Sequence, residues 1–258
     1  MSNHTQPHTW PRLYIHEQIK AVGQPISLAE EQSRYLLNVM RLRPGDSVRL
    51  FNGQDGEYIA RARSLPQKKK EPLILHTEKL YREQIEEPDL WLCCAPIRKA
   101  FFDYTIMKST ELGVSVIQPY LTSRTQVRDI NLDHLQRVAI EAAEQSERLT
   151  VPEIRPLLRL DQLLSTWPSS RLALVCAEYG QATPIACALQ KPLAQSRPKA
   201  AIFTGPEGGY TESELTDIMK LDESCTVRLG PRILRADTAA LAALSCWQSL
   251  CGDWRTHG

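Results

Sequence analysis

Residues 200–209 read Ala-Ala-Ile-Phe-Thr-Gly-Pro-Glu-Gly-Gly. The uncharged first half predicts a buried strand over 200–204, and the proline and glycines after it predict a tight turn. Glycine allows a positive φ and lets a ligand approach the main chain closely. The stretch has neither the Lys-Ser/Thr of a phosphate loop nor the G-x-G-x-x-G of dinucleotide binders. Taken alone, it is more often a structural turn than a binding site.

Two further segments follow predicted strands. Residues 176–180 read Cys-Ala-Glu-Tyr-Gly, and residues 229–239 read Leu-Gly-Pro-Arg-Ile-Leu-Arg-Ala-Asp-Thr-Ala. Ligands of open α/β sheets bind outside the carboxyl ends of the strands, so all three segments are candidate binding loops. For the last segment the plainer interpretation is a bend at Gly230-Pro231 followed by a helix capped by Asp237 or Thr238.

The C-terminal part alternates strands with helices, which predicts an α/β fold with a mainly parallel sheet. Strands are predicted at residues 90–95, 114–119, 172–177, 200–204 and 226–229. Helices are predicted at residues 99–112, 132–148, 183–189, 212–221 and 235–250.

The N-terminal part has a different pattern. Short strands are predicted at residues 11–15, 48–52, 58–63 and 72–80, with Asp55-Gly56 as a hairpin turn and a helix start at Ser27. Short strands with turns between them suggest a small β-barrel. A charged stretch over 81–88 is expected to be a linker. We therefore expect two domains, at residues 1–80 and 81–258.

Composition excludes several classes of protein. No apolar stretch approaches the roughly 20 residues that a membrane helix requires, and the polar N-terminus lacks a secretory signal, so a cytoplasmic protein with no membrane contact is expected. The seven cysteines form no C-x-x-C pair or Cys/His cluster. Neither a disulfide framework nor a bound metal is therefore expected.

The net charge of +1 is unevenly divided along the chain. Residues 1–80 hold 12 Lys and Arg against 8 Asp and Glu, a net charge of +4, and the remainder carries −3. A basic N-terminal module permits contact with phosphates, although ordinary surface variation explains the charge equally well. The candidate phosphate contacts are Arg12, Arg41, Arg43, Arg49, Arg61, Arg63 and Lys68–Lys70.

Taken together, the motifs resemble a known family. Gly-Pro-Glu-Gly-Gly at 205–209 followed by residues 229–239 resembles the C-terminal signature of the SPOUT methyltransferases, and of their RsmE-type family most closely. That family methylates N3 of a uridine in small-subunit ribosomal RNA. Its other motifs resemble residues 40–46, 51–53, 108–114 and 141–146 with Arg148, Pro152 and Ile154. Two departures are Asp237, where the family commonly has Glu, and Tyr35, where it has His.

The resemblance implies a trefoil-knotted SPOUT domain behind an N-terminal PUA-like small β-barrel domain. It also implies S-adenosylmethionine as cofactor, the 16S ribosomal RNA of the small subunit as substrate, and a homodimer active in ribosome biogenesis. The residues expected by resemblance to bind the methyl donor are Leu174, Glu178, Thr204, Gly205, Pro206, Gly208, Gly209, Leu229, Gly230, Ile233, Leu234, Arg235, Thr238 and Ala239.

Methylation of uridine N3 requires the loss of its proton, so the site needs a proton acceptor or a cation that stabilises negative charge on the base. Arg148 is the candidate cation, since Glu141, Gln145 and Arg148 would share one face of a helix. An ordinary surface pair of Glu144 with Arg148 explains the same spacing. Glu207 and Asp237 are candidate acceptors, although either residue could simply hold a loop.

Two alternatives stay open. The acceptor could be a ribose 2′-hydroxyl or a guanine, as in other SPOUT enzymes. The chain could instead be an RNA-binding ribosome-assembly factor without catalysis, which intact donor loops disfavour.

Overall fold

The computed structural model describes residues 7–68, 71–177, 182–190 and 199–255. The chain forms two compact units. Unit 1 comprises residues 1–86 together with Ala143–Thr150, and unit 2 comprises Glu87–Ala142 and Val151–Gly258. The second segment of unit 1 had no counterpart in the sequence analysis.

Unit 1 is built on one five-stranded sheet with the order β1-β3-β4-β5-β2. Among the described residues no pairing of β1 with β2 closes this sheet into a barrel. Its core is apolar and includes Leu50, Leu73 and Leu75, which are fully buried. The elements are β1 (Arg12–Tyr14), β2 (Pro25–Ser27), α1 (Glu30–Arg34), a π-helical turn (Tyr35–Val39), β3 (Ser47–Phe51), β4 (Glu57–Ala62) and β5 (Ile74–Arg82).

The helix start expected at Ser27 is wrong. Ser27 ends β2, a strand that the sequence analysis missed, and α1 begins three residues later without a side-chain cap from Ala29. The hairpin through Asp55-Gly56 is confirmed, because β3 and β4 pair antiparallel on either side of it. The Asn52 side-chain oxygen accepts hydrogen bonds from the backbone N–H groups of Gln54 and Asp55 and holds this turn.

Unit 2 has an eight-stranded sheet in which every recorded pairing is parallel. The alternation of strands and helices expected from the sequence is therefore confirmed. The strand order is β11-β13-β10-β12-β6-β7-β8, with β9 also paired to β7. The strands are β6 (Leu90–Cys94), β7 (Val116–Leu121), β8 (Glu153–Ile154), β9 (Leu158–Arg159), β10 (Leu172–Cys176), β11 (Thr183–Pro184), β12 (Ala200–Thr204) and β13 (Ser224–Arg228).

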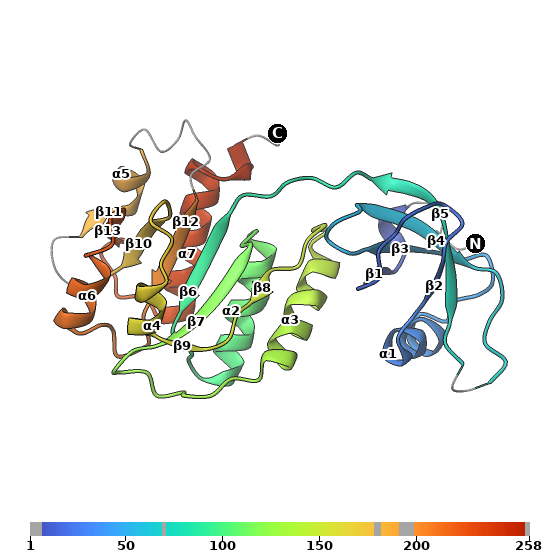
Figure 1. Cartoon of the computed structure of the whole chain (residues 1–258), viewed down its shortest axis with the longest axis horizontal. Coiled ribbons are helices and arrows are strands. Elements are labelled where there is room, and N and C mark those ends of the chain that lie inside the picture. The colour runs from blue at the N-terminus through green and yellow to red at the C-terminus, as the bar shows by residue number, and fades with distance from the viewer. Residues whose placement is uncertain (1–6, 69–70, 178–181, 191–198, 256–258) are drawn as a thin grey trace. The chain divides into compact units, whose positions relative to one another are not determined.

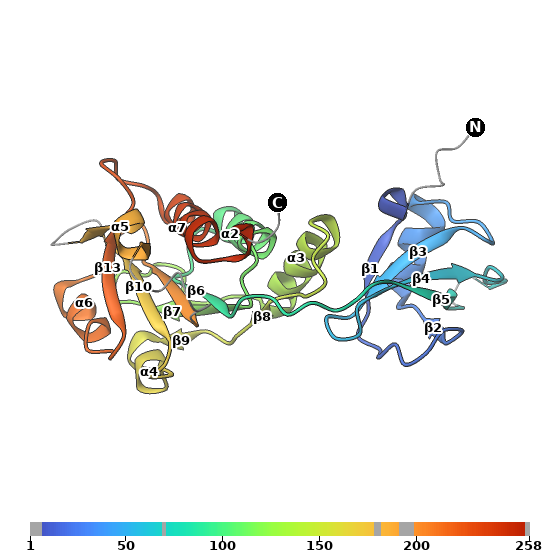
Figure 2. The same cartoon turned by 90° about the horizontal axis from the view of Figure 1, so that it is seen from above.

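Helices cover both faces of this sheet (Figures 1 and 2). The helices α2 (Lys99–Glu111), α5 (Ile185–Leu189) and α7 (Ala236–Leu250) pack into one core, and α4 (Leu160–Ser165) and α6 (Glu212–Ile218) pack into the other. Strands β6 and β12 are buried along their whole length, which agrees with sequences that are apolar except at Thr204. This three-layer arrangement places the loops after β10, β12 and β13 at one edge of the sheet.

Helix α3 (Leu132–Gln145) begins in unit 2, and its last three residues belong to unit 1. It ends three residues earlier than the sequence analysis predicts. Glu147 lies beyond it with a φ of 65°, in the left-handed region that an α-helix excludes. Arg148 is therefore not on the helical face of Glu141 and Gln145, and that expectation was wrong.

Candidate functional site

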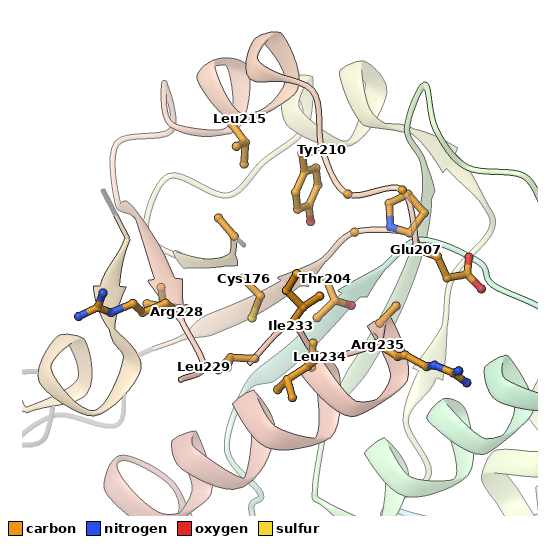
Figure 3. Close-up of a pocket in the computed structure, with 18 of the residues that line it drawn as sticks. Cys176, Thr204, Glu207, Tyr210, Leu215, Arg228, Leu229, Ile233, Leu234 and Arg235 are labelled. Atoms are coloured by element: carbon orange, nitrogen blue, oxygen red, sulfur yellow. The ribbon is translucent and has the colours of Figure 1, made fainter. Parts of the chain in front are cut away.

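A cavity of about 620 Å³ lies in unit 2 at the carboxyl ends of β10, β12 and β13. The parallel register aligns Cys176 with Thr204 and with Val227, so the three strands end at one edge. The loop 204–210 after β12 and the loop 228–236 after β13 form most of the walls. Figure 3 shows the side chains of both loops around this space. All three candidate loops thus contribute to one cavity, the loop after β10 through Cys176 and Ala177.

The loop 204–210 depends on its glycines. Gly209 has a φ of 65°, where a side chain would be strained, and its N–H donates to the Pro206 carbonyl at 2.9 Å. A Cβ at Gly205 would lie 3.1 Å from the ring of Tyr210. The glycines therefore permit both the left-handed turn and the close packing of Tyr210 on the main chain.

Most of the residues expected to bind the donor line this cavity. They are Thr204, Gly205, Pro206, Gly208, Gly209, Leu229, Gly230, Ile233, Leu234, Arg235 and Ala239. Leu174 is instead buried within β10, at 1% exposure, and Thr238 is not among the lining residues. Glu178 lies outside the described residues.

Of the three candidate catalytic residues, Glu207 and Asp237 belong to unit 2 and Arg148 belongs to unit 1. Glu207 is exposed and lines the cavity. Asp237 lies in the first turn of α7, does not line the cavity, and accepts a hydrogen bond from the N–H of Thr238 at 2.8 Å. Arg148 belongs to unit 1, is 8% exposed, and donates to the Thr150 hydroxyl at 2.9 Å. Of the three, only Glu207 is among the residues that line the cavity.

Several further residues line the cavity that were not among the expected donor contacts. They are Arg124, Cys176, Ala177, Tyr210, Glu212, Leu215, Val227, Arg228, Pro231, Arg232 and Ala236. Cys176, Ala177, Pro231, Arg232 and Ala236 lie within the candidate loops, and Tyr210, Glu212, Val227 and Arg228 lie within three residues of them. Arg124 comes from the turn after β7, and no motif marked it. The walls hold four arginines against two glutamates, so the fixed side-chain charge of the cavity is positive.

Buried hydroxyl and thiol groups at this cavity stay neutral. Burial raises the pKa of the Cys176 thiol to about 12 and raises the pKa of Tyr210 well above its ordinary value. Neither group is therefore an anion near neutral pH. Cys176 contributes an apolar surface rather than a nucleophile.

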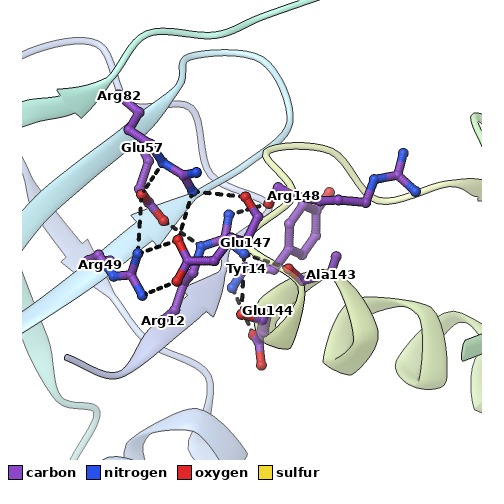
Figure 4. Close-up of polar contacts among 9 residues, drawn as sticks. All are labelled: Arg12, Tyr14, Arg49, Glu57, Arg82, Ala143, Glu144, Glu147 and Arg148. Carbon is purple, nitrogen blue, oxygen red and sulfur yellow. Dashed lines mark hydrogen bonds and ion pairs between the residues drawn. The ribbon is translucent and has the colours of Figure 1, made fainter. Parts of the chain in front are cut away.

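Unit 1 contains a cluster of buried charges (Figure 4). Glu57 is completely buried and forms ion pairs with Arg12, with Arg82 at 2.7 Å and with Arg49 at 3.7 Å. Arg49 also pairs with both carboxylate oxygens of Glu147, at 2.6 and 2.7 Å. Arg12 and Arg49 are 6% and 3% exposed, respectively. This group is called the Glu57 cluster below.

The Glu57 cluster holds the segment Ala143–Thr150 within unit 1. Arg12 donates to the carbonyl oxygens of Ala143, at 2.6 Å, and of Arg148. The Glu144 carboxylate accepts a hydrogen bond from the N–H of Tyr14 at 2.9 Å. The central motif of the sequence thus supplies structural anchors, which the sequence analysis did not foresee.

The expected phosphate contacts fall into two groups. For Arg12 and Arg49 the expectation of a phosphate contact is corrected. Both are buried among carboxylates and carbonyl oxygens, so they are not placed to meet a phosphate at the surface. The exposed group comprises Arg41, Arg43, Arg61, Arg63 and Lys68. Lys69 and Lys70 lie outside the described residues.

Two kinds of feature are absent from the described residues. No helix there is long and apolar enough to cross a membrane. In the same part of the chain, no group of three or more His, Cys, Asp or Glu side chains is arranged to hold a metal ion.

Comparison with known proteins gives matches to nearly the whole chain. Residues 85–248 match the family model of an RNA methyltransferase domain, and residues 28–70 match that of an RNA methyltransferase PUA domain. The ribosomal RNA small subunit methyltransferase E of Rickettsia conorii is 32% identical, over 91% of this chain and 93% of its own length. That of Bacillus subtilis is 30% identical, over 85% and 88%.

Solved structures agree with these matches. The ribosomal RNA small subunit methyltransferase E of Neisseria gonorrhoeae, solved with S-adenosylmethionine, has a TM-score of 0.81 and 34% identity, covering 95% of this chain and 99% of its own. A Legionella pneumophila protein that also holds S-adenosylmethionine has a TM-score of 0.80 and 27% identity over the same shares. With an α/β domain behind a PUA-type domain, this chain belongs to the RNA methyltransferase family of ribosomal RNA small subunit methyltransferase E.

Proposed function

We propose that this chain transfers a methyl group from S-adenosylmethionine to N3 of a uridine in the 16S ribosomal RNA of the small subunit. In this proposal residues 81–258 form a trefoil-knotted SPOUT domain, residues 1–80 form a PUA-like RNA-binding domain, and the enzyme is a cytoplasmic homodimer. The observation that carries the proposal is the cavity in which the loops 204–210 and 228–236 meet.

The residues around the cavity fit this methyl donor. Its volume of about 620 Å³ lies within the range of small-molecule sites, roughly 300–1,000 Å³. Leu229, Ile233, Leu234 and Ala239 offer apolar surface for the adenosine portion, and the glycine loop brings main-chain polar groups to the same space. The bound donor would supply a methyl group already activated by its sulfonium, so the protein chiefly positions the reactants.

Glu207 is the proposed proton acceptor for uridine N3. It lines the cavity and is exposed, so its carboxylate can accept a proton from a base that enters from solvent. Glu207→Gln should lower turnover at least a hundredfold while leaving donor affinity within about twofold. Unchanged turnover would remove Glu207 from this role. Glu212→Gln, at a second carboxylate that lines the cavity, is the matched control.

The cation that stabilises charge on the base is proposed to come from the cavity itself. Arg124, Arg228, Arg232 and Arg235 line it and are exposed. Arg148, the residue predicted from the sequence for this role, belongs to unit 1 and donates to the Thr150 hydroxyl there. Exposed arginines at the cavity and in unit 1 are suited to a polyanionic RNA, whose affinity for the protein should fall steeply with salt.

Nucleoside analysis tests the proposed reaction. Small-subunit ribosomal RNA from cells without the protein should contain one fewer N3-methylated uridine. The purified protein with S-adenosylmethionine should restore this methylation. Methylation at a ribose 2′-hydroxyl or a guanine would refute the acceptor but retain the enzyme class. Failure to bind S-adenosylmethionine in calorimetry would favour the assembly factor without catalysis.

A further inference from the structure

The turn after β7 lies against the glycine loop of the cavity. Tyr120, near the end of β7, is fully buried, and its hydroxyl donates to the Thr204 carbonyl at 3.1 Å. The same hydroxyl is within hydrogen-bond distance of the Tyr210 hydroxyl. Because the Tyr120 proton is directed at Thr204, Tyr210 is the donor of this second bond. The two tyrosines thus link both ends of the loop 204–210.

Both hydroxyls keep their protons under ordinary conditions. Burial raises the pKa of Tyr120 and of Tyr210 well above the ordinary tyrosine value. The Tyr210 ring also packs on Gly205, where an added Cβ would lie 3.1–3.3 Å from ring carbons. The tyrosine pair therefore fixes the start of the loop by hydrogen bonding and by packing.

Arg124 contacts the far end of the same loop. One nitrogen, Nη1, donates to the Gly208 carbonyl at 2.8 Å and to the Tyr210 carbonyl at 3.2 Å. Its aliphatic carbons lie over Gly208, where an added Cβ would meet the Arg124 Cβ at 3.2 Å. Bonds from a charged donor to carbonyls are among the stronger hydrogen bonds in proteins. Arg124 thus clamps the glycines that the sequence motif contains.

The residue before Arg124 is tied to the helix after the loop. The N–H of Ser123 donates to the Glu214 carboxylate at 2.7 Å, and Glu214 forms a capping box with Thr211 at the start of α6. Burial alone would raise the pKa of Glu214, but hydrogen bonds from Ser123 and Thr211 outweigh it and lower the pKa. The loop is therefore held at both ends and along its length by the end of β7 and the turn after it.

We propose that Tyr120, Arg124 and Tyr210 are positioning residues that hold the loop 204–210 in the shape that binds the methyl donor. The proposal rests on the proposed function for the identity of that donor. None of the three belongs to the motifs that identified the donor loops. The loop is pre-organised by the end of β7 and the turn after it, so that less ordering accompanies donor binding.

Calorimetry with S-adenosylmethionine, in the absence of RNA, tests the proposal. Arg124→Met retains the carbons over Gly208 but removes the donors, and should weaken donor affinity at least tenfold. Tyr210→Phe retains the ring on Gly205 and should weaken affinity roughly fivefold. Arg128→Met and Tyr104→Phe make the same chemical changes at exposed positions that do not line the cavity, and should leave affinity within twofold.

Two readouts separate positioning from a general loss of structure. Misfolded protein would lower the binding stoichiometry while leaving the dissociation constant of the folded fraction unchanged, whereas a misplaced loop raises the dissociation constant. Affinity within twofold of the parent protein in both Arg124→Met and Tyr210→Phe would overturn the proposal.

Hydrogen exchange of the donor-free protein gives a test that does not depend on the donor. Amides of Gly205 and of residues 207–210 should exchange several-fold faster in Arg124→Met than in Arg128→Met. Equal exchange would refute the clamp even if the parent protein bound S-adenosylmethionine. Absence of donor binding by the parent protein, with faster exchange in Arg124→Met, would instead refute the proposed donor and retain the clamp.

Discussion

Replacement of Glu57 by glutamine should destabilise unit 1 strongly. The Glu57 side chain is completely buried and provides the negative charge for Arg12 and for Arg49, whose side chains are each 3% exposed. Glutamine has almost the same shape, so Glu57→Gln leaves the packing intact while the two buried guanidinium groups lose a counter-charge. Its amide NH₂ would also face guanidinium donors instead of accepting from them.

Breaking a buried ion pair by removing one partner costs about 3–5 kcal/mol. Glu147 still neutralises part of the charge on Arg49, which places the expected loss near the lower end, at about 3 kcal/mol. A typical domain has only about 5–15 kcal/mol of stability. The predicted loss is therefore a large fraction of what holds unit 1 together.

Native-state hydrogen exchange of β3 and β4 amides measures the opening of unit 1 separately from unit 2. The matched control is Glu78→Gln on β5, which removes an ion pair with Arg61 at 3.4 Å between side chains that are 43% and 44% exposed. That change should cost less than about 1 kcal/mol. A loss below about 1 kcal/mol in Glu57→Gln, equal to the control, would refute the reasoning that buried charge compensation stabilises this unit.

Three further predictions follow from other contacts. Hydrogen bonds from Arg49 lower the pKa of Glu147 below its ordinary 4.5, so its contribution to stability is complete above pH 4.5 and is lost as the pH falls through the lowered value. Acid titration of unfolding should therefore be flatter in Glu147→Gln than in the parent protein. Gly209→Ala should lower the free energy of unfolding in urea by about 1–2 kcal/mol, because its φ of 65° is strained for a residue with a side chain. No atom lies within 4 Å of the added methyl group, so steric clash adds nothing to this cost. Arg43→Gln should lower the slope of log affinity for RNA against log salt by about 1 in anisotropy titrations, and an unchanged slope would exclude it as a phosphate contact.

The parts of the fold that could be predicted are those whose burial is fixed by the sheet. Strand β12 has the bounds that its apolar run predicts, because both of its faces are covered by helices. Strands β8 and β9 were missed because two residues each are too few to show a period. The start of α1 was misplaced because Ser27, a common N-cap residue, is used to pair β2 with β5.

The candidate site could be predicted only where the chain itself carries the pattern. Residues of the two motif loops were found because strand, glycine turn and helix follow one another in sequence. Arg124 and Tyr120 act through the spatial neighbourhood of β7, which no local spacing reveals. Arg12 and Arg49 look like surface cations because nothing in the sequence indicates that Glu57, the carboxylate that pairs with them, is buried.

The return of the chain into unit 1 at Ala143–Thr150 limits how this protein can be dissected. Three covalent crossings, at residues 86/87, 142/143 and 150/151, join the two units, so no single cut releases either one whole. A fragment that begins at residue 81 would retain Glu147 but discard Arg49, its bidentate partner, and would leave the end of α3 without its docking surface. Expression of residues 81–258 alone is therefore a poor route to an isolated catalytic module. A fragment that also omits residues 143–150 needs a new linker in their place.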